Sequence, residues 1–143
     1  MAERKRTDQL GVGEELEPYQ FRVTHEFNHQ YLEAVDDYHR RYLGETEFGP
    51  PVVHPALFIN YSSITRSPSF YLPSGMAAVV AKDEIEYLNP GRVGKNFRIS
   101  WKVADTYTKR GRPYQVTEIS VVDEDGMKIL RRRMNCTYVA GKE

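Results

Sequence analysis

One short apolar segment constrains the fold of this chain more than any other feature. It begins at Pro55 and stays almost wholly apolar through Tyr61, shortly after the chain breaker Gly49-Pro50-Pro51. Proline suits the first turn of a helix, where its missing N–H costs no hydrogen bond. A helix with so little polar surface is normally buried, and this one is far shorter than the roughly 20 residues that cross a membrane. The rest of the chain must therefore wrap around it.

The second half of the chain contains four strand-like runs that could supply this wrapping. Turn signals separate them, namely Asn89-Pro90-Gly91, residues 109–113 and residues 123–126. Alternation of apolar and polar residues in the second run predicts a sheet with one buried face. Because hairpin links are short, we expect a meander whose sequential strands are mostly neighbours. The predicted strands are residues 76–88, 95–107, 114–122 and 127–139.

An arginine in the last run, Arg132, shares the parity of the apolar Leu130 and Met134. Such a residue lies beyond the core, sits at a β-bulge, or faces a buried anion. The first two explanations together are the preferred interpretation.

The first half of the chain predicts a strand and an amphipathic helix before the apolar segment. Residues 19–24 alternate and are rich in β-formers, which indicates a strand. Thr24 has the chemistry of an N-cap for a helix over residues 25–42. Its apolar positions at helical spacing are 27, 31, 34, 35, 38 and 42. We expect residues 1–15 to be a flexible segment, residues 67–75 to be a loop and residues 16–140 to form one domain.

Composition excludes several classes of function. The 143 residues carry 20 basic and 20 acidic side chains, so no net field attracts nucleic acid or a membrane surface. The single cysteine, Cys136, excludes an internal disulfide and a multi-cysteine metal site. No apolar signal segment is visible at the start, which favours a cytoplasmic location.

One motif invites a metal interpretation. Residues 25–29 read HEFNH and match the H-E-x-x-H pattern, in which two histidines one helical turn apart bind zinc. The motif opens a helix directly after a strand and lacks aliphatic flanks and an evident third ligand. We therefore expect no metal site.

Four segments, taken in their order and spacing, resemble the MaoC-like dehydratase family, which includes (R)-specific enoyl-CoA hydratases. The likeness is greatest to the family's N-terminal dehydratase domain type. The segments are residues 31–39, residues 49–57, residues 84–95, and the turns at 109–113 and 123–126. The resemblance implies an α+β hotdog fold, in which a curved antiparallel sheet wraps around a central apolar helix. It also implies an acyl thioester of CoA or acyl carrier protein as ligand, and we expect no cofactor.

The resemblance further implies a catalytic set, which this chain matches only in part. Family members use an aspartate, a histidine five positions later, and the N–H of a glycine that opens the central helix. Histidine titrates near neutral pH, and a helix start presents N–H donors to an oxyanion. Asp37 matches the aspartate, but Tyr42 stands at the histidine position. Pro55, which has no N–H, stands at the glycine position.

Other residues could restore the missing parts. His39 and His54 are the candidate catalytic histidines beside Asp37, and the amide of Ala56 could replace the lost oxyanion donor. Each also has an ordinary structural interpretation, such as an exposed helical histidine for His39 and an N-cap for His54. The remaining candidates for substrate binding are Asp36, Tyr42, Tyr61, and three arginines that could receive a phosphate, Arg92, Arg110 and Arg112.

These features lead to one principal hypothesis and two alternatives. The chain is an acyl-thioester hydratase or dehydratase homologue, either active or the non-catalytic, acyl-chain-binding subunit of a heteromeric enzyme. The alternatives are a thioesterase on the same fold and a binding or assembly subunit without chemistry. Because a hotdog sheet has a long exposed edge, we expect a homodimer or a heterodimer with a second hotdog subunit.

Overall fold

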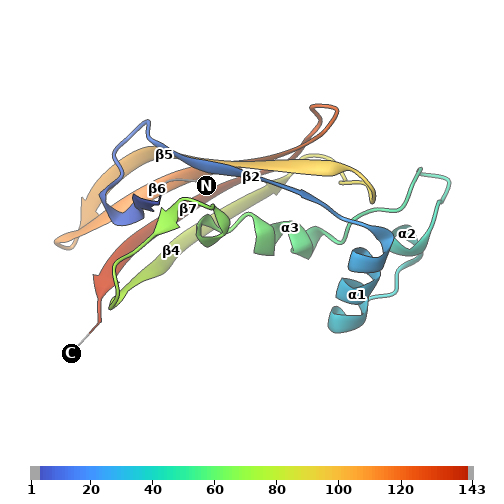
Figure 1. The fold of residues 1–143 in the computed structure, drawn as a ribbon, viewed down its shortest axis with the longest axis horizontal. Coiled ribbons are helices and arrows are strands. Elements are labelled where there is room, and N and C mark those ends of the chain that lie inside the picture. Colours follow the sequence, from blue (N-terminus) through green and yellow to red (C-terminus); the bar gives the residue numbers. More distant parts are fainter. Residues whose placement is uncertain (1–3, 142–143) are drawn as a thin grey trace.

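A computed structural model describes residues 4–141 and shows a long five-stranded sheet, a short two-stranded sheet and three helices (Figure 1). None of the helices in this range is long and apolar enough to span a membrane. The elements in chain order are β1 (Lys5–Arg6), a 3-10 turn (Thr7–Gln9), β2 (Glu15–Arg22), α1 (His25–Val35), α2 (Arg40–Leu43), α3 (Pro55–Tyr61), a second 3-10 turn (Ile64–Arg66), β3 (Phe70–Tyr71), β4 (Met76–Tyr87), β5 (Asn96–Lys109), β6 (Arg112–Asp123) and β7 (Lys128–Ala140).

Four of the five strands of the main sheet lie within two residues of their predicted bounds, but their order differs from the prediction. The antiparallel sheet runs β2-β5-β6-β7-β4, so β4 pairs with β7 at one edge and is not a neighbour of β5. The prediction of a simple meander is therefore wrong for β4. The link between β4 and β5 is not a hairpin, because the two strands are not neighbours. The link pairs instead with the segment before α3. Val53 donates to the Gly91 carbonyl at 2.8 Å, and Val93 donates to the Pro51 carbonyl at 2.9 Å.

The apolar helix α3 lies against one face of the sheet, called here the inner face (Figure 1). Leu57 and Phe58 are each 1% exposed, and they pack with the inward side chains of β5 to β7. The indole N–H of Trp101 on β5 donates to the Ser62 carbonyl at 3.0 Å and holds the C-terminal end of α3. The predicted central helix is thus confirmed, although Asn60 is exposed and the helix is not covered on every side in the single chain.

The predicted flexible segment is packed where the structure describes it. Residues 1–3 lie outside the described range, but Lys5–Arg6 forms a parallel pair with Phe70–Tyr71. Thr7 and Leu10 are buried, at 0% and 7% exposure. The prediction of a loose segment is therefore wrong for residues 5–10, and the predicted loop at 67–75 contains the short strand that holds it.

The predicted helix over residues 25–42 is two helices with a turn between them. Thr24 caps α1 as predicted, since its side chain accepts from the Phe27 N–H at 3.1 Å. However, α1 ends at Val35, because Asp36 adopts a left-handed conformation with φ of 54°. The buried residues of α1 are Asn28 and Leu32, and the predicted apolar face is wrong at its far end, where Val35 is 43% exposed.

Arg132 faces an anion, contrary to the preferred interpretation of the sequence. It lies on the inner face of β7 and is 5% exposed. Its guanidinium binds both carboxylate oxygens of Asp83 on β4, at 2.9 and 2.6 Å. It also donates to the Ile59 carbonyl at 2.8 Å and to the Ser62 hydroxyl at 2.9 Å. A buried guanidinium can be tolerated here because these acceptors replace the water that it loses.

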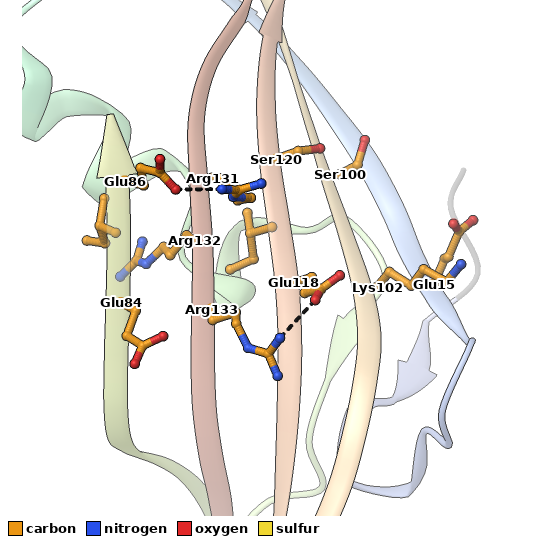
Figure 2. A pocket seen from close by; sticks show the side chains of 12 residues that line it. Glu15, Glu84, Glu86, Ser100, Lys102, Glu118, Ser120, Arg131, Arg132 and Arg133 are labelled. Atoms are coloured by element: carbon orange, nitrogen blue, oxygen red, sulfur yellow. Dashed lines mark hydrogen bonds and ion pairs between the residues drawn. The ribbon is translucent and has the colours of Figure 1, made fainter. Parts of the chain in front are cut away.

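The outer face of the sheet carries a row of alternating charges across all five strands (Figure 2). The paired positions across the sheet are Glu84, Arg133, Glu118, Lys102 and Glu15, in that order. Arg133 binds Glu118 at 3.0 Å. Opposite charges on neighbouring strands favour this register, and the mixed signs leave no single-sign field on this face.

Candidate active site

Asp37 and His54 form the centre of the candidate site. Asp37 follows α1, and His54 immediately precedes α3. In the sequence, α2 lies between the two residues. The His54 Nε2 lies 3.1 Å from the Asp37 Oδ2. The Asp37 side chain is 40% exposed and that of His54 is 15% exposed, so the pair lies at the surface end of the core.

Both ring nitrogens of His54 are engaged. Nδ1 accepts from the Ala56 N–H at 3.2 Å, so His54 is the N-cap of α3. An accepting Nδ1 carries no proton, and the neutral ring therefore donates its Nε2–H to Asp37. Tyr31 and Tyr42 flank the ring, with centroid distances of 5.3 and 5.0 Å.

Asp37 is held in its ionised form. Its Oδ1 accepts from the His39 backbone N–H at 3.2 Å. This hydrogen bond, followed by that from His54, holds the pKa of the Asp37 carboxyl below its usual value. The Nδ1 of the His39 ring instead accepts from the Arg41 N–H at 3.2 Å and from the Arg41 Nε at 3.1 Å. Of the two candidate histidines, only His54 bonds to Asp37 through its ring.

Tyr42 occupies the position where the resemblance leads us to expect a histidine. Its side chain is buried at 8% exposure, and it contacts the His54 ring. Burial raises the pKa of the Tyr42 phenol. The hydroxyl therefore stays protonated at neutral pH and cannot take the role of a base.

The start of α3 presents no free N–H donor among the described residues. Pro55 has none, and the Ala56 N–H is bound to His54 Nδ1. The next amide, that of Leu57, donates to the His54 carbonyl at 3.0 Å. The predicted role of Ala56 as an oxyanion donor would require its amide to leave His54.

The structure does not bring the remaining predicted residues to this pair. Arg92 donates to the carbonyls of Pro50 and Phe48, at 2.6 and 3.0 Å, and so fixes the loop before α3. Arg110 and Arg112 lie at the β5–β6 hairpin, at the opposite end of the sheet from α1 (Figure 1).

Two further candidates, Asp36 and Tyr61, contribute to the ends of helices. Asp36 is the left-handed C-cap of α1, next to Asp37 in the chain. Tyr61 lies in the last turn of α3, the end opposite His54, and stacks on Phe21 at a centroid distance of 4.6 Å.

A cavity of about 350 Å³ lies near the pair, but neither Asp37 nor His54 lines it. Tyr42, which contacts the His54 ring, and Pro55, which follows His54 in the chain, both line it. Most of the remaining wall is apolar and includes Phe58, Leu88 and Ile129. A cavity with walls of this kind suits an apolar chain.

Sequence reasoning missed Asn28, which positions His54. Asn28 is 1% exposed, and its side-chain oxygen accepts from the His54 backbone N–H at 3.2 Å. Its amide nitrogen lies 3.3 Å from the Val52 carbonyl and 3.4 Å from the Tyr42 carbonyl. The available signal was a polar residue four positions before Leu32, on the same face of the helix.

The HEFNH motif does not assemble a metal site in the described part of the chain. No group of three His, Cys, Asp or Glu side chains lies close enough to hold an ion within residues 4–141. His29 instead lies 3.7 Å from Glu33, one turn later on α1.

Comparison with known proteins identifies the fold. No family model and no curated protein sequence matches the chain. The R-hydratase PhaJ1 from Pseudomonas aeruginosa is 15% identical with a TM-score of 0.74, and the match covers 94% of this chain and 84% of that one. The MaoC-like dehydratase from Rhodospirillum rubrum is 16% identical with a TM-score of 0.75, covering 97% of this chain and 99% of that one. The chain has the hotdog fold.

A chain of a two-protein assembly shares this hotdog fold as well. In the ChsH1-ChsH2 complex from Mycobacterium tuberculosis the matched chain is 12% identical with a TM-score of 0.67. That match covers 90% of this chain and 98% of the other. The predicted resemblance to MaoC-like dehydratases and (R)-hydratases is thus confirmed at the level of the fold.

Proposed function

We propose that this hotdog protein binds acyl thioesters as the acyl-chain-binding subunit of a heteromeric hydratase or dehydratase. The apolar cavity beside Asp37 and His54 would hold the acyl chain. The hotdog folds of an R-hydratase and a MaoC-like dehydratase support this assignment to acyl-thioester chemistry.

The occupied start of α3 is the observation that carries the non-catalytic part of the proposal. Addition of water to an enoyl thioester places negative charge on the thioester oxygen, and preorganised N–H donors must stabilise it. Here Pro55 has no N–H and the Ala56 N–H is bound to His54. A second subunit would have to supply the donor, together with a histidine that is free to exchange protons.

The free edge of the sheet supports a hotdog partner. Strand β4 is an edge strand of 12 residues. The backbone N–H and C=O groups along its free edge pair with no described strand. Val79 and Val80 on this strand are 45% and 47% exposed. Pairing with a second hotdog sheet would cover both features. A homodimer would duplicate the occupied helix start, so a heterodimer suits the proposed role better.

A second candidate function, hydration by this chain alone, is favoured by the Asp37–His54 contact. In this alternative the pair takes a proton from water, the hydroxyl adds to the β-carbon, and the proton returns to the α-carbon. A proton on His54 Nδ1 would end its acceptance from Ala56. The freed Ala56 N–H could then turn to the thioester oxygen, so protonation and oxyanion binding would be linked.

Hydration and binding assays of short and long trans-2-enoyl-CoA would separate the two candidates. We expect the purified chain to bind these thioesters and to hydrate them only with a second hotdog subunit. Hydration by the chain alone, reduced roughly a hundredfold or more in Asp37→Asn and His54→Gln, would establish the second candidate instead. Asp36→Asn is the matched control, because this neighbouring carboxylate does not contact His54. Absence of both binding and hydration would refute both candidates.

A further inference from the structure

Arg41 places a charge at an otherwise uncharged cavity. It is the one charged residue among the described residues that line the cavity beside the Asp37–His54 pair. Its side chain is exposed, whereas the adjacent Tyr42 is buried against His54. Arg41 therefore lies at the outer end of the cavity. Its neighbour in the chain, Tyr42, contacts the His54 ring.

The Arg41 guanidinium is held in place but leaves most of its donors available. Its Nε donates to His39 Nδ1 at 3.1 Å, and its Cζ lies 5.6 Å from the Tyr42 ring centroid. Within residues 4–141, its two terminal nitrogens meet no carboxylate and no other acceptor at hydrogen-bond distance.

Neighbouring arginines show that this availability is unusual in the region. Arg40 is paired with Glu47. Arg92 is bound to two backbone carbonyls of the loop before α3. Arg41 is thus oriented by one bond while its planar fork stays available, which is the arrangement that binds a carboxylate or phosphate through two parallel hydrogen bonds.

From this geometry we infer that Arg41 recognises an anionic group on the thioester ligand, at the end of the cavity away from Phe58. The inference rests on the proposed function and specifies its substrate class. Two sources could supply the anion, a phosphate of the CoA or phosphopantetheine arm, or a carboxylate at the end of the acyl chain. The shared chemistry is a planar or tetrahedral oxyanion within reach of a guanidinium.

Three probes distinguish these sources by isothermal titration calorimetry. The first is trans-2-hexenoyl-CoA, which carries phosphates. The second is the N-acetylcysteamine thioester of the same acid, which is uncharged. The third is that uncharged thioester with a carboxylate added at the end of its acyl chain. Each is titrated into the wild-type chain and into Arg41→Gln, Arg41→Lys and Arg40→Gln.

We expect Arg41→Gln to weaken binding of at least one anionic probe by about tenfold to a hundredfold and to leave the uncharged probe unchanged. Arg41→Lys should give an intermediate loss, because it keeps the charge but not the fork. Arg40→Gln should bind all probes like the wild type. A loss confined to hexenoyl-CoA identifies the phosphate, and a loss confined to the carboxylate probe identifies the acyl terminus.

Other outcomes overturn the inference. An unchanged affinity of Arg41→Gln for both anionic probes does so, while binding of the uncharged probe would leave the proposed function standing. An equal loss for all three probes also does so, because it indicates damage to the cavity rather than lost recognition of an anion. If the wild-type chain binds none of the probes, the proposed function fails together with the inference.

Discussion

The two faces of the sheet use the same kind of ion pair in opposite surroundings. On β7, Arg131 and Arg133 point to the outer face, and Arg132 between them points to the inner face. Arg133 binds Glu118, and their side chains are 46% and 52% exposed. Arg132 binds Asp83, and their side chains are 6% and 28% exposed. One step along the strand therefore separates a solvated pair from a buried one.

The contribution of an ion pair to stability therefore depends less on which residues form it than on their access to water. On the outer face, water competes with each pair and salt screens it, so each pair contributes little. On the inner face, Arg132 cannot return to water without opening the core. It also joins β7 to the end of α3 through the Ile59 carbonyl and the Ser62 hydroxyl. The buried pair thus fixes the helix whose other end carries His54.

The largest expected effect comes from removing the buried cation. Arg132→Met should lower the free energy of unfolding by about 3 kcal/mol, because Asp83 and the Ile59 carbonyl lose their partner in a poorly solvated place. Urea denaturation followed by circular dichroism measures this change. The double variant Arg132→Met/Asp83→Leu should recover part of the loss, since it leaves no unpaired carboxylate. A loss below 1 kcal/mol in the single variant would break the contrast between the faces.

A packing variant on the inner face should have the next largest effect. A Cβ added at Gly91 would lie 2.5 Å from Phe58 Cζ and 3.1 Å from Phe97 Cε1. Gly91→Ala should therefore destabilise the fold by about 2 kcal/mol through overpacking against α3. Gly44→Ala is the matched control, because a Cβ there meets nothing within 4 Å. Thermal unfolding of the two variants should separate them clearly, and equal melting temperatures would contradict the close packing of α3.

The smallest effect is expected on the outer face. Arg133→Ala should lower the free energy of unfolding by no more than about 1 kcal/mol, because it removes one exposed pair from the charged row. The wild-type advantage should shrink further at high salt. Urea titrations of both proteins at low and high sodium chloride test this. A salt-independent loss as large as that of Arg132→Met would show that the row acts as a cooperative unit.

The fold was largely readable from sequence where the signal is local. Residue alternation located four strands to within two residues, and the apolar segment at Pro55 located the central helix. The position of β4 beside β7 was not readable, because a strand pattern does not name its neighbour. The end of α1 was missed because Asp36 takes a left-handed conformation, while the spacing of apolar residues still suggested a longer helix.

What the sequence by itself determined was the four long strands of the second half, the central helix and the chemical types available to the site: Asp37, two nearby histidines, and a proline where an N–H donor was expected. Only the tertiary structure decided that His54 rather than His39 meets Asp37, and that Asp83 meets Arg132. The physical reason is distance along the chain. Propensity and periodicity act between close neighbours, whereas these pairs form when packing of α3 on the sheet brings remote segments together.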